Sequence, residues 1–210
     1  VDKVYGYDDS ELQKMKLPEL RETVESLGKR KAGSMSFPIG KNGLSKKDMV
    51  FGAHRSHSHV IALDECIHKL FAEILGKETG LSKGMGGSMH LTNTKSGFMG
   101  SVPIVAGTVP LAVGASFDSR YRNKEDIGVA YVGDGAMEEG IVQESLNLSK
   151  ILNTPTLFIV ENNLFSSHMH ISLRQPSDKI SRFAVANNIP FKLEDGNNVV
   201  SVYKSSKKLI

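Results

Sequence analysis

The sequence contains a single cysteine, little excess charge of either sign and no long apolar run. Because Cys66 is alone, the 210 residues cannot form an internal disulfide framework, and a reducing compartment is expected. The 26 basic and 23 acidic residues give a net charge of +3, which offers no electrostatic reason to expect nucleic acid as a partner. The longest mostly apolar stretch, 104–117, is too short and too interrupted by glycine and proline to cross a membrane.

No repeat and no linker divides the chain, and no signal peptide is visible, so we expect a single domain over residues 1–210. The apolar fraction of 40% and the charged fraction of 23% are ordinary for a globular protein, and this length can support a hydrophobic core. The sequence begins with Val1 rather than Met, and we expect a segment to be missing in front of it.

The most informative stretch runs from Ile127 to Phe165. Two β-branched apolar runs of strand length, 127–132 and 156–160, flank an amphipathic segment. That segment has acidic residues near its start, where they suit the positive end of a helix, and it stops at Asn153-Thr154-Pro155. The pattern predicts a β-α-β unit with parallel strands and a right-handed crossover, and therefore an α/β fold.

Polar residues follow both predicted strands. Asp134 lies in a Gly133-Asp134-Gly135 turn after the first, and Asn163 comes 29 positions later, after the second. Neighbouring strands lie about 4.8 Å apart, so a carboxylate and an amide oxygen at their carboxyl ends can share one cation at about 2.1 Å. Gly133 and Gly135 permit close backbone approach, and amides at the helix start can cradle a phosphate. The stretch therefore suggests a magnesium-bound diphosphate.

Outside this unit the local signals are weaker. We expect helices over 11–27, from Asp64 to Gly76, from Pro110 to about Asp118, near 178–186 and from Val199, and a short strand near Phe191. The helix after Asp64 is expected to place its apolar residues on one face, namely Ile67, Leu70, Phe71, Ile74 and Leu75. Loops are expected at 34–43, at 79–100 and over the irregular stretch 163–176.

Two further strings can carry chemistry. The His54-Arg55-Ser56-His57-Ser58-His59 string admits a zinc site, a polar loop with hydrogen-bonded histidines, or a diphosphate contact through Arg55, whose planar guanidinium binds two oxygens at once. The Gly-rich string 84–90, GMGGSMH, is either a flexible surface loop or backbone that approaches a ligand or partner closely.

Four strings, in the same order, resemble the alpha subunit of the thiamine diphosphate-dependent decarboxylating component of 2-oxo acid dehydrogenase complexes. HRSH resembles that family's YRxH segment, GMGGSMH its GKGGSMH segment, and IVAGTVPLAVGA its IVGAQVPLAVGA segment. GDGAMEEG followed by ENN resembles its metal motif, and the similarity covers roughly residues 50–203. The resemblance implies a three-layer thiamine diphosphate-binding fold, in which a parallel sheet carries helices on both faces.

The resemblance also implies roles for individual residues. The metal, Mg²⁺, would be held by Asp134, Asn163 and the backbone carbonyl of Phe165. His57 and His90 are the candidate catalytic residues. The candidate cofactor-binding residues are His54, Arg55, Pro103, Val105, Gly133, Asp134, Gly135, Ala136, Asn163, Phe165 and Ser166.

The implied reaction is the oxidative decarboxylation of a small 2-oxo acid, with acyl transfer to the lipoyl group of an acyltransferase. Such subunits take the glutamate that activates the cofactor from a beta subunit, so an α₂β₂ heterotetramer is expected, in the cytoplasm or the mitochondrial matrix. Alternatives are an acetoin dehydrogenase, another thiamine diphosphate-dependent transferase or lyase subunit, and a non-catalytic paralogue.

The sequence departs from the family pattern at three places. Ser36 stands where a histidine usually precedes an Ile-Gly-Gln-Glu segment, the stretch between Gly40 and Asp48 is short, and the sequence stops at Ile210, before a histidine-containing loop over the diphosphate. These departures concern substrate handling more than metal and diphosphate binding.

Overall fold

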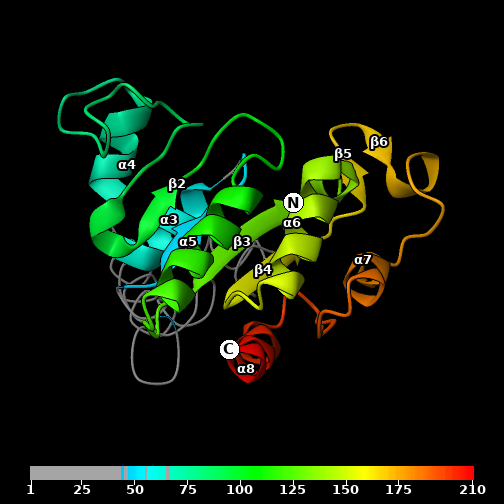
Figure 1. Cartoon of the computed structure of the whole chain (residues 1–210). Coiled ribbons are helices and arrows are strands. Elements are labelled where there is room, and N and C mark those ends of the chain that lie inside the picture. Colours follow the sequence, from blue (N-terminus) through cyan, green and yellow to red (C-terminus); the bar gives the residue numbers. More distant parts are fainter. Residues whose placement is uncertain (1–43, 45–46, 55, 65–66) are drawn as a thin grey trace.

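The computed structural model describes residues 44, 47–54, 56–64 and 67–210, and Figure 1 shows how their elements are arranged. The helix expected over 11–27, the loop at 34–43, Ser36 and Arg55 lie outside these residues. In chain order the elements are β1 (Met49–Phe51), α3 (His57–Asp64), α4 (Ile67–Ile74), η1 (Thr94–Ser96), β2 (Phe98–Gly100), α5 (Val109–Tyr121), β3 (Gly128–Gly133), η2 (Ala136–Glu138), α6 (Gly140–Ile151), β4 (Thr156–Glu161), β5 (Phe165–Ser166), β6 (Met169–His170), η3 (Ile171–Leu173), α7 (Ser181–Ala186) and α8 (Val199–Leu209).

Four strands form a parallel sheet in the order β2-β1-β3-β4. Strands β3 and β4 pair from Gly128 opposite Thr156 to Gly133 opposite Glu161, and α6 connects them. The predicted β-α-β unit is therefore confirmed. Because all four strands run the same way, their carboxyl ends meet at one edge of the sheet.

Helices cover both faces of this sheet, as the alternating side chains of β3 show. Val129 and Tyr131 pack in one cluster with buried residues of α3 and α4. Ala130 packs on the other face with Ala112 of α5, and Val132 packs there with buried residues of α6. Figure 1 shows α5 and α6 side by side across this second face. The predicted α/β architecture with three layers is confirmed.

The predictions for the segment after Asp64 were partly wrong. The predicted helix forms as α4, over Ile67–Ile74, but the preceding helix α3 was not predicted, and Asp64 is its last residue. Leu70 is buried as expected, but Phe71 and Leu75 are 59% and 68% exposed, whereas Glu73 is completely buried. Glu73 is buried because the loop after α4 folds back over the helix and presents backbone N–H groups to it. A carboxylate can accept these hydrogen bonds, and an apolar side chain cannot.

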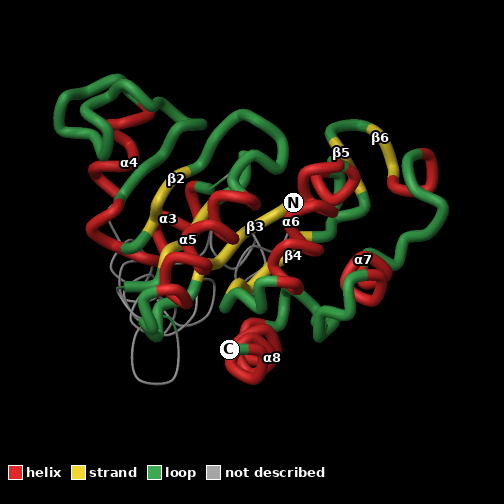
Figure 2. The backbone as a smooth tube through the Cα atoms, viewed as in Figure 1, coloured by secondary structure: helices red, strands yellow, loops and turns green. Residues whose placement is uncertain are grey.

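The predictions for the later segments had mixed outcomes. Helices α5, α7 and α8 form where they were expected. The strand near Phe191 was wrong, because residues 191–195 are exposed irregular chain and no burial favours an extended pairing there. Figure 2 shows the long loop between α4 and β2, and a second irregular region between β4 and α7 that contains the unpredicted hairpin β5–β6. None of the helices in the described ranges has the length and apolar character needed to span a bilayer.

Candidate functional site

The ends of β3 and β4 are joined directly by backbone and side-chain contacts. The Asp134 N–H donates to the carbonyl of Glu161 at 3.2 Å. The Asn163 N–H lies 3.4 Å from Asp134 Oδ1, and the Asp134 residue is only 1% exposed. The paired strands thus bring the backbone of Asn163 to the Asp134 carboxylate, whereas a cation shared by the two side chains stays a prediction.

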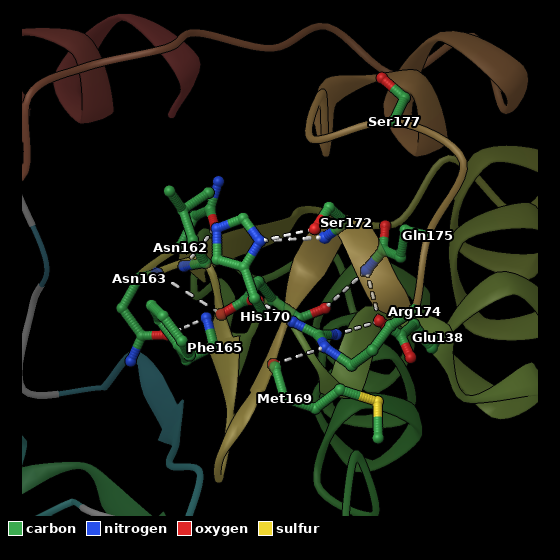
Figure 3. Close-up of polar contacts among 12 residues, drawn as sticks. Glu138, Asn162, Asn163, Phe165, Met169, His170, Ser172, Arg174, Gln175 and Ser177 are labelled. Carbon is green, nitrogen blue, oxygen red and sulfur yellow. Dashed lines mark hydrogen bonds and ion pairs between the residues drawn. The ribbon is translucent and has the colours of Figure 1, made fainter.

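The Asn162-Asn163 pair turns the chain away from β4. Asn162 Oδ1 accepts the Leu164 N–H at 3.1 Å, and Asn163 Oδ1 accepts the Phe165 N–H at 2.9 Å. Both contacts are Asx turns, in which a side-chain oxygen replaces a backbone acceptor. The two turns lead into β5, and Figure 3 shows Asn163 beside Phe165 with this bond drawn. An amide oxygen has two lone pairs, so Asn163 Oδ1 keeps acceptor capacity.

The hairpin β5–β6 packs on the turn that carries Asp134. A Cβ atom at Gly135 would lie 2.5 Å from Ser166 Oγ and 2.6 Å from Ser166 Cβ, closer than real Cβ atoms approach. Gly135 is thus required by the contact with Ser166, whereas a Cβ at Gly133 would meet none of the described atoms within 4 Å. Ala136, the remaining candidate on this turn, begins η2 and is half-buried.

A buried arginine neutralises the acidic side chains at this edge. Arg174 Nη2 donates to Asp134 Oδ2 at 2.6 Å, and Arg174 Nη1 donates to Glu138 Oε1. Arg174 Nε also donates to the carbonyl of Met169 at 3.1 Å, so all three guanidinium nitrogens have partners. The Arg174 and Asp134 side chains are 5% and 2% exposed, which makes this an ion pair in a low-dielectric setting.

The network continues into the segment before α7. Gln175 Nε2 donates to Glu138 Oε1 at 2.6 Å and lies 3.3 Å from the Asp134 carbonyl, and Arg182 Nη2 donates to Gln175 Oε1 at 2.7 Å. Figure 3 shows Glu138, Arg174 and Gln175 pointing toward one another. The sequence analysis gave neither Glu138 nor Arg174 a role in the site. The irregular stretch that carries Arg174 offered no spacing signal that points back to Asp134.

The histidines of the HRSH string separate in space. His54 follows β1 and is half-buried, and the neighbouring Arg55 lies outside the described residues. His57 begins α3, and its Nε2 lies 2.7 Å from Ser88 Oγ in the Gly-rich string. His90, at the end of that string, is exposed. The structure thus joins the HRSH and GMGGSMH strings through His57 and Ser88.

His59 is a buried histidine that sequence reasoning left without a role. Its ring stacks on Tyr131 with centroids 3.9 Å apart, and its Nε2 lies 3.3 Å from Glu161 Oε1. Burial is the main cause that raises the pKa of the Tyr131 hydroxyl, and the nearby charge of Glu161 raises it further. The hydroxyl therefore stays neutral. This contact fastens α3 to the end of β4.

Pro103 and Val105 lie on the loop that leads from β2 into α5, and both are exposed. Because this loop follows the carboxyl end of β2, it belongs to the same edge of the sheet as Asp134 and Asn163. Residues that follow all four parallel strands thus reach one edge, where open α/β sheets bind ligands.

The donor atoms beside Asp134 suit a hard cation. Within the described part of the chain, Asp134 Oδ1 has one long contact, to the Asn163 N–H at 3.4 Å, and Asp134 Oδ2 is taken by Arg174. Asn163 Oδ1 accepts the Phe165 N–H and retains a lone pair. Across the described ranges, no three histidine, cysteine, aspartate or glutamate residues gather as a metal cluster. A cation at this position would rely on one carboxylate with amide and carbonyl oxygens. That oxygen set suits Mg²⁺, and the zinc alternative gains no support.

These features define an α/β protein with a polar, partly acidic site at the carboxyl edge of a parallel sheet. The chain belongs to the dehydrogenase E1 component family, whose profile matches residues 30–209. The family resemblance inferred from the sequence is therefore confirmed.

Individual relatives are similar over most of this chain. It is 36% identical over 180 residues to the alpha subunit of acetoin:2,6-dichlorophenolindophenol oxidoreductase from Bacillus subtilis, covering 85% of this chain and 54% of that protein. It is 34% identical over 167 residues to the pyruvate dehydrogenase E1 component subunit alpha of Rhizobium meliloti, covering 80% and 48%. The mitochondrial pyruvate dehydrogenase E1 subunit alpha of Kluyveromyces lactis is 34% identical over 176 residues, covering 83% and 42%. The chain thus spans about half the length of these relatives.

Proposed function

We propose that this chain is part of the alpha subunit of a thiamine diphosphate-dependent 2-oxo acid dehydrogenase. The proposed reaction is the oxidative decarboxylation of a 2-oxo acid, with transfer of the acyl group to a lipoyl group on an acyltransferase. The observation that carries this proposal is the backbone N–H of Asn163, which lies 3.4 Å from Oδ1 of the buried Asp134 carboxylate at the carboxyl edge of a parallel sheet. The pyruvate dehydrogenase names of two relatives support the substrate class.

The residues of this chain have distinct tasks in the proposal. Asp134, Asn163 and the carbonyl of Phe165 hold Mg²⁺, and amides of Gly135 and Ala136 bind the diphosphate oxygens. Arg55 and His54 add contacts to the cofactor, Gly133 and Ser166 border it, and Pro103 and Val105 offer backbone groups to its aminopyrimidine ring. When bound, thiamine diphosphate supplies the carbanion that attacks the oxo carbonyl, and the protein orients and polarises it.

His57 and His90 are proposed as the catalytic residues that move protons near the substrate. The hydrogen bond between His57 Nε2 and Ser88 Oγ supports this role for His57, because an oriented imidazole is a better general acid or base than a mobile one. His90 lies at the end of the Gly-rich string whose Ser88 contacts His57, so the string links the two histidines.

A beta subunit completes the proposed enzyme. Glu138 is engaged by Arg174 and Gln175, and Glu73 is engaged by backbone amides, so neither is offered to a cofactor nitrogen. We therefore propose that the activating glutamate comes from the partner, in an α₂β₂ assembly. The relatives are named as alpha subunits, which supports the proposal that a second kind of subunit is present.

Calorimetry tests the cofactor assignment. The chain, co-purified with its beta subunit, is titrated with thiamine diphosphate in Mg²⁺, and Asp134→Ala is expected to weaken binding at least about 100-fold, because one metal ligand and its charge are lost. Glu125→Ala, an exposed acid that precedes the amino end of β3, is the matched control and should bind normally. Equal affinities for the wild type and Asp134→Ala would contradict the assignment.

Acetoin cleavage is a second candidate, favoured by the 36% identity to an acetoin oxidoreductase subunit. A turnover assay with pyruvate, branched-chain 2-oxo acids and acetoin, using 2,6-dichlorophenolindophenol as electron acceptor, separates the two. Higher kcat/KM for a 2-oxo acid supports the first proposal, and higher kcat/KM for acetoin supports the second.

A further inference from the structure

Glu73 is a buried carboxylate that the proposed reaction does not use. It lies on α4, is completely buried, and accepts three backbone N–H groups of the following loop. Ser82 and Gly84 donate to Oε2 at 2.6 and 2.9 Å, and Gly86 donates to Oε1 at 2.7 Å. Residues 75–93, between α4 and η1, form the Gly-rich loop, which therefore wraps around a side chain of its own subunit. Figure 1 shows this loop folded back beside α4.

Three glycines of the loop are required by close contacts, one of them with Glu73 itself. A Cβ at Gly80 would lie 2.4 Å from Glu73 Oε2 and 2.6 Å from Glu73 Cα. Gly84 has a φ of +75° and a Cβ there would meet Gly76 at 2.4 Å, while a Cβ at Gly86 would meet the His90 carbonyl at 2.3 Å. Gly80 thus lets the backbone pass close to α4, and Gly84 and Gly86 let the loop pack closely against its own backbone.

The pKa of Glu73 agrees with a carboxylate held by backbone N–H groups. Burial raises the pKa of the Glu73 carboxyl, but the amides of Gly84, Ser82, Gly86 and Gly87 together outweigh burial and hold that pKa below its ordinary value. Glu73 is thus an anion inside a nest of backbone donors, which is the arrangement by which amide dipoles bind anions.

The loop leaves this nest and reaches His57. Ser88, two residues after Gly86, has its Oγ 2.7 Å from His57 Nε2. Beyond Ser88 the chain is fixed again, because Ser101 Oγ donates to the Met89 carbonyl at 3.0 Å and accepts the Leu91 N–H at 3.1 Å. Ser88 is therefore held on both sides, by the Glu73 nest before it and by Ser101 after it.

We propose that Glu73 is a positioning residue that fixes the Gly-rich loop and, through Ser88, sets the orientation of the His57 imidazole. The effect on the ring is independent of the reaction, whereas its consequence for turnover rests on the function proposed above. Glu73→Gln keeps the shape of the side chain but can serve only one arm of the nest, because its NH₂ group faces amide donors instead of accepting from them.

The test uses the αβ complex with ¹⁵N-labelled histidine, at one fixed pH. Ser88→Ala is expected to change the His57 Nε2 chemical shift, and Glu73→Gln is expected to change it in the same direction. The double variant is expected to resemble Ser88→Ala alone, because Glu73 acts through Ser88. Amide exchange at Ser82, Gly84 and Gly86 should accelerate about 10-fold or more in Glu73→Gln.

Controls separate positioning from general loss of structure. Glu78→Gln, an exposed acid on the same loop, should change neither reading. Glu73→Asp, which retains the charge on a shorter arm, should restore part of the amide protection, and it replaces Glu73→Gln in the comparison if that variant does not fold. An unchanged His57 shift in a folded Glu73 variant, or fully additive effects of Glu73 and Ser88, would overturn the proposal. A changed shift with unchanged decarboxylation supports the positioning and counts against the catalytic role proposed for His57, whereas a wild-type complex that decarboxylates no 2-oxo acid counts against the proposed function alone.

Discussion

At the scale of single residues, Arg174 determines the electrostatics of the candidate site. It places one guanidinium between Asp134 and Glu138, and the Asp134–Arg174 pair is almost fully buried. Burying two charges is costly, so such a pair adds little net stability over apolar packing, but removing one partner leaves an uncompensated buried charge. The contribution of Arg174 should therefore appear when it is deleted.

The first prediction concerns this deletion. Arg174→Ala is expected to lower the free energy of unfolding by about 3 kcal/mol, because Asp134 stays buried without its cation. Arg122→Ala breaks a pair with Asp118 in which both side chains are exposed, 63% for Arg122 and 49% for Asp118, and should leave the free energy of unfolding almost unchanged. Urea unfolding of both variants measures the difference, and similar small losses would show that Asp134 does not depend on Arg174.

Glu73 gives a prediction for pH. Because its folded-state pKa is below the ordinary value, the charged form stabilises the fold above the unfolded pKa, and this stabilisation is lost as pH falls through the folded pKa. The wild type should exceed Glu73→Gln in stability by about 2 kcal/mol at pH 7, with the difference shrinking below about pH 4. Thermal unfolding of both proteins across pH checks this, and a constant difference would contradict it.

At the scale of elements, the hairpin β5–β6 and the turn after β3 form one unit. The contact between Gly135 and Ser166 ties residues that follow β3 to residues that follow β4, so the site depends on both strand ends at once. A side chain at position 135 should push the hairpin away.

Gly135→Ala is accordingly expected to destabilise the protein by about 1–3 kcal/mol, since overpacking displaces Ser166. Ser166→Gly in the same chain should recover at least half of that loss by removing the clashing atoms. Gly114→Ala in α5 is the control, because its added methyl meets no atom within 4 Å and should stabilise the helix by up to about 1 kcal/mol. Calorimetric melting compares the three variants, and a Gly135→Ala protein as stable as the wild type would contradict the packing argument.

The elements that could be predicted from the sequence are those set by local patterns. The β-branched runs at 127–132 and 156–160, the intervening amphipathic stretch and the stop at Pro155 fixed β3, α6 and β4 in advance. Burial of Glu73 could not be predicted, because its partners are backbone amides of a loop whose path depends on tertiary contacts. The hairpin β5–β6 was missed because strands of two residues carry no periodic signal.

At the scale of the whole molecule, the candidate site is assembled from segments that follow four parallel strands. The separation of Asp134 and Asn163 by one β-α-β unit could be predicted, since neighbouring parallel strands must end at the same edge. The ion pairs of Arg174 could not, because no spacing rule connects residue 134 to residue 174 across an irregular segment. The proposed activity needs the proposed beta subunit as well, whereas the proposed cation site uses residues of this chain alone.

The most direct test of the account is to locate that cation. A crystal of the αβ complex grown with Mn²⁺ and thiamine diphosphate should show a Mn²⁺ anomalous peak about 2.1 Å from oxygens of both Asp134 and Asn163. The peak should disappear in Asp134→Ala crystals grown in the same way. A cofactor bound with its Mn²⁺ held by other residues, away from the ends of β3 and β4, would contradict the account.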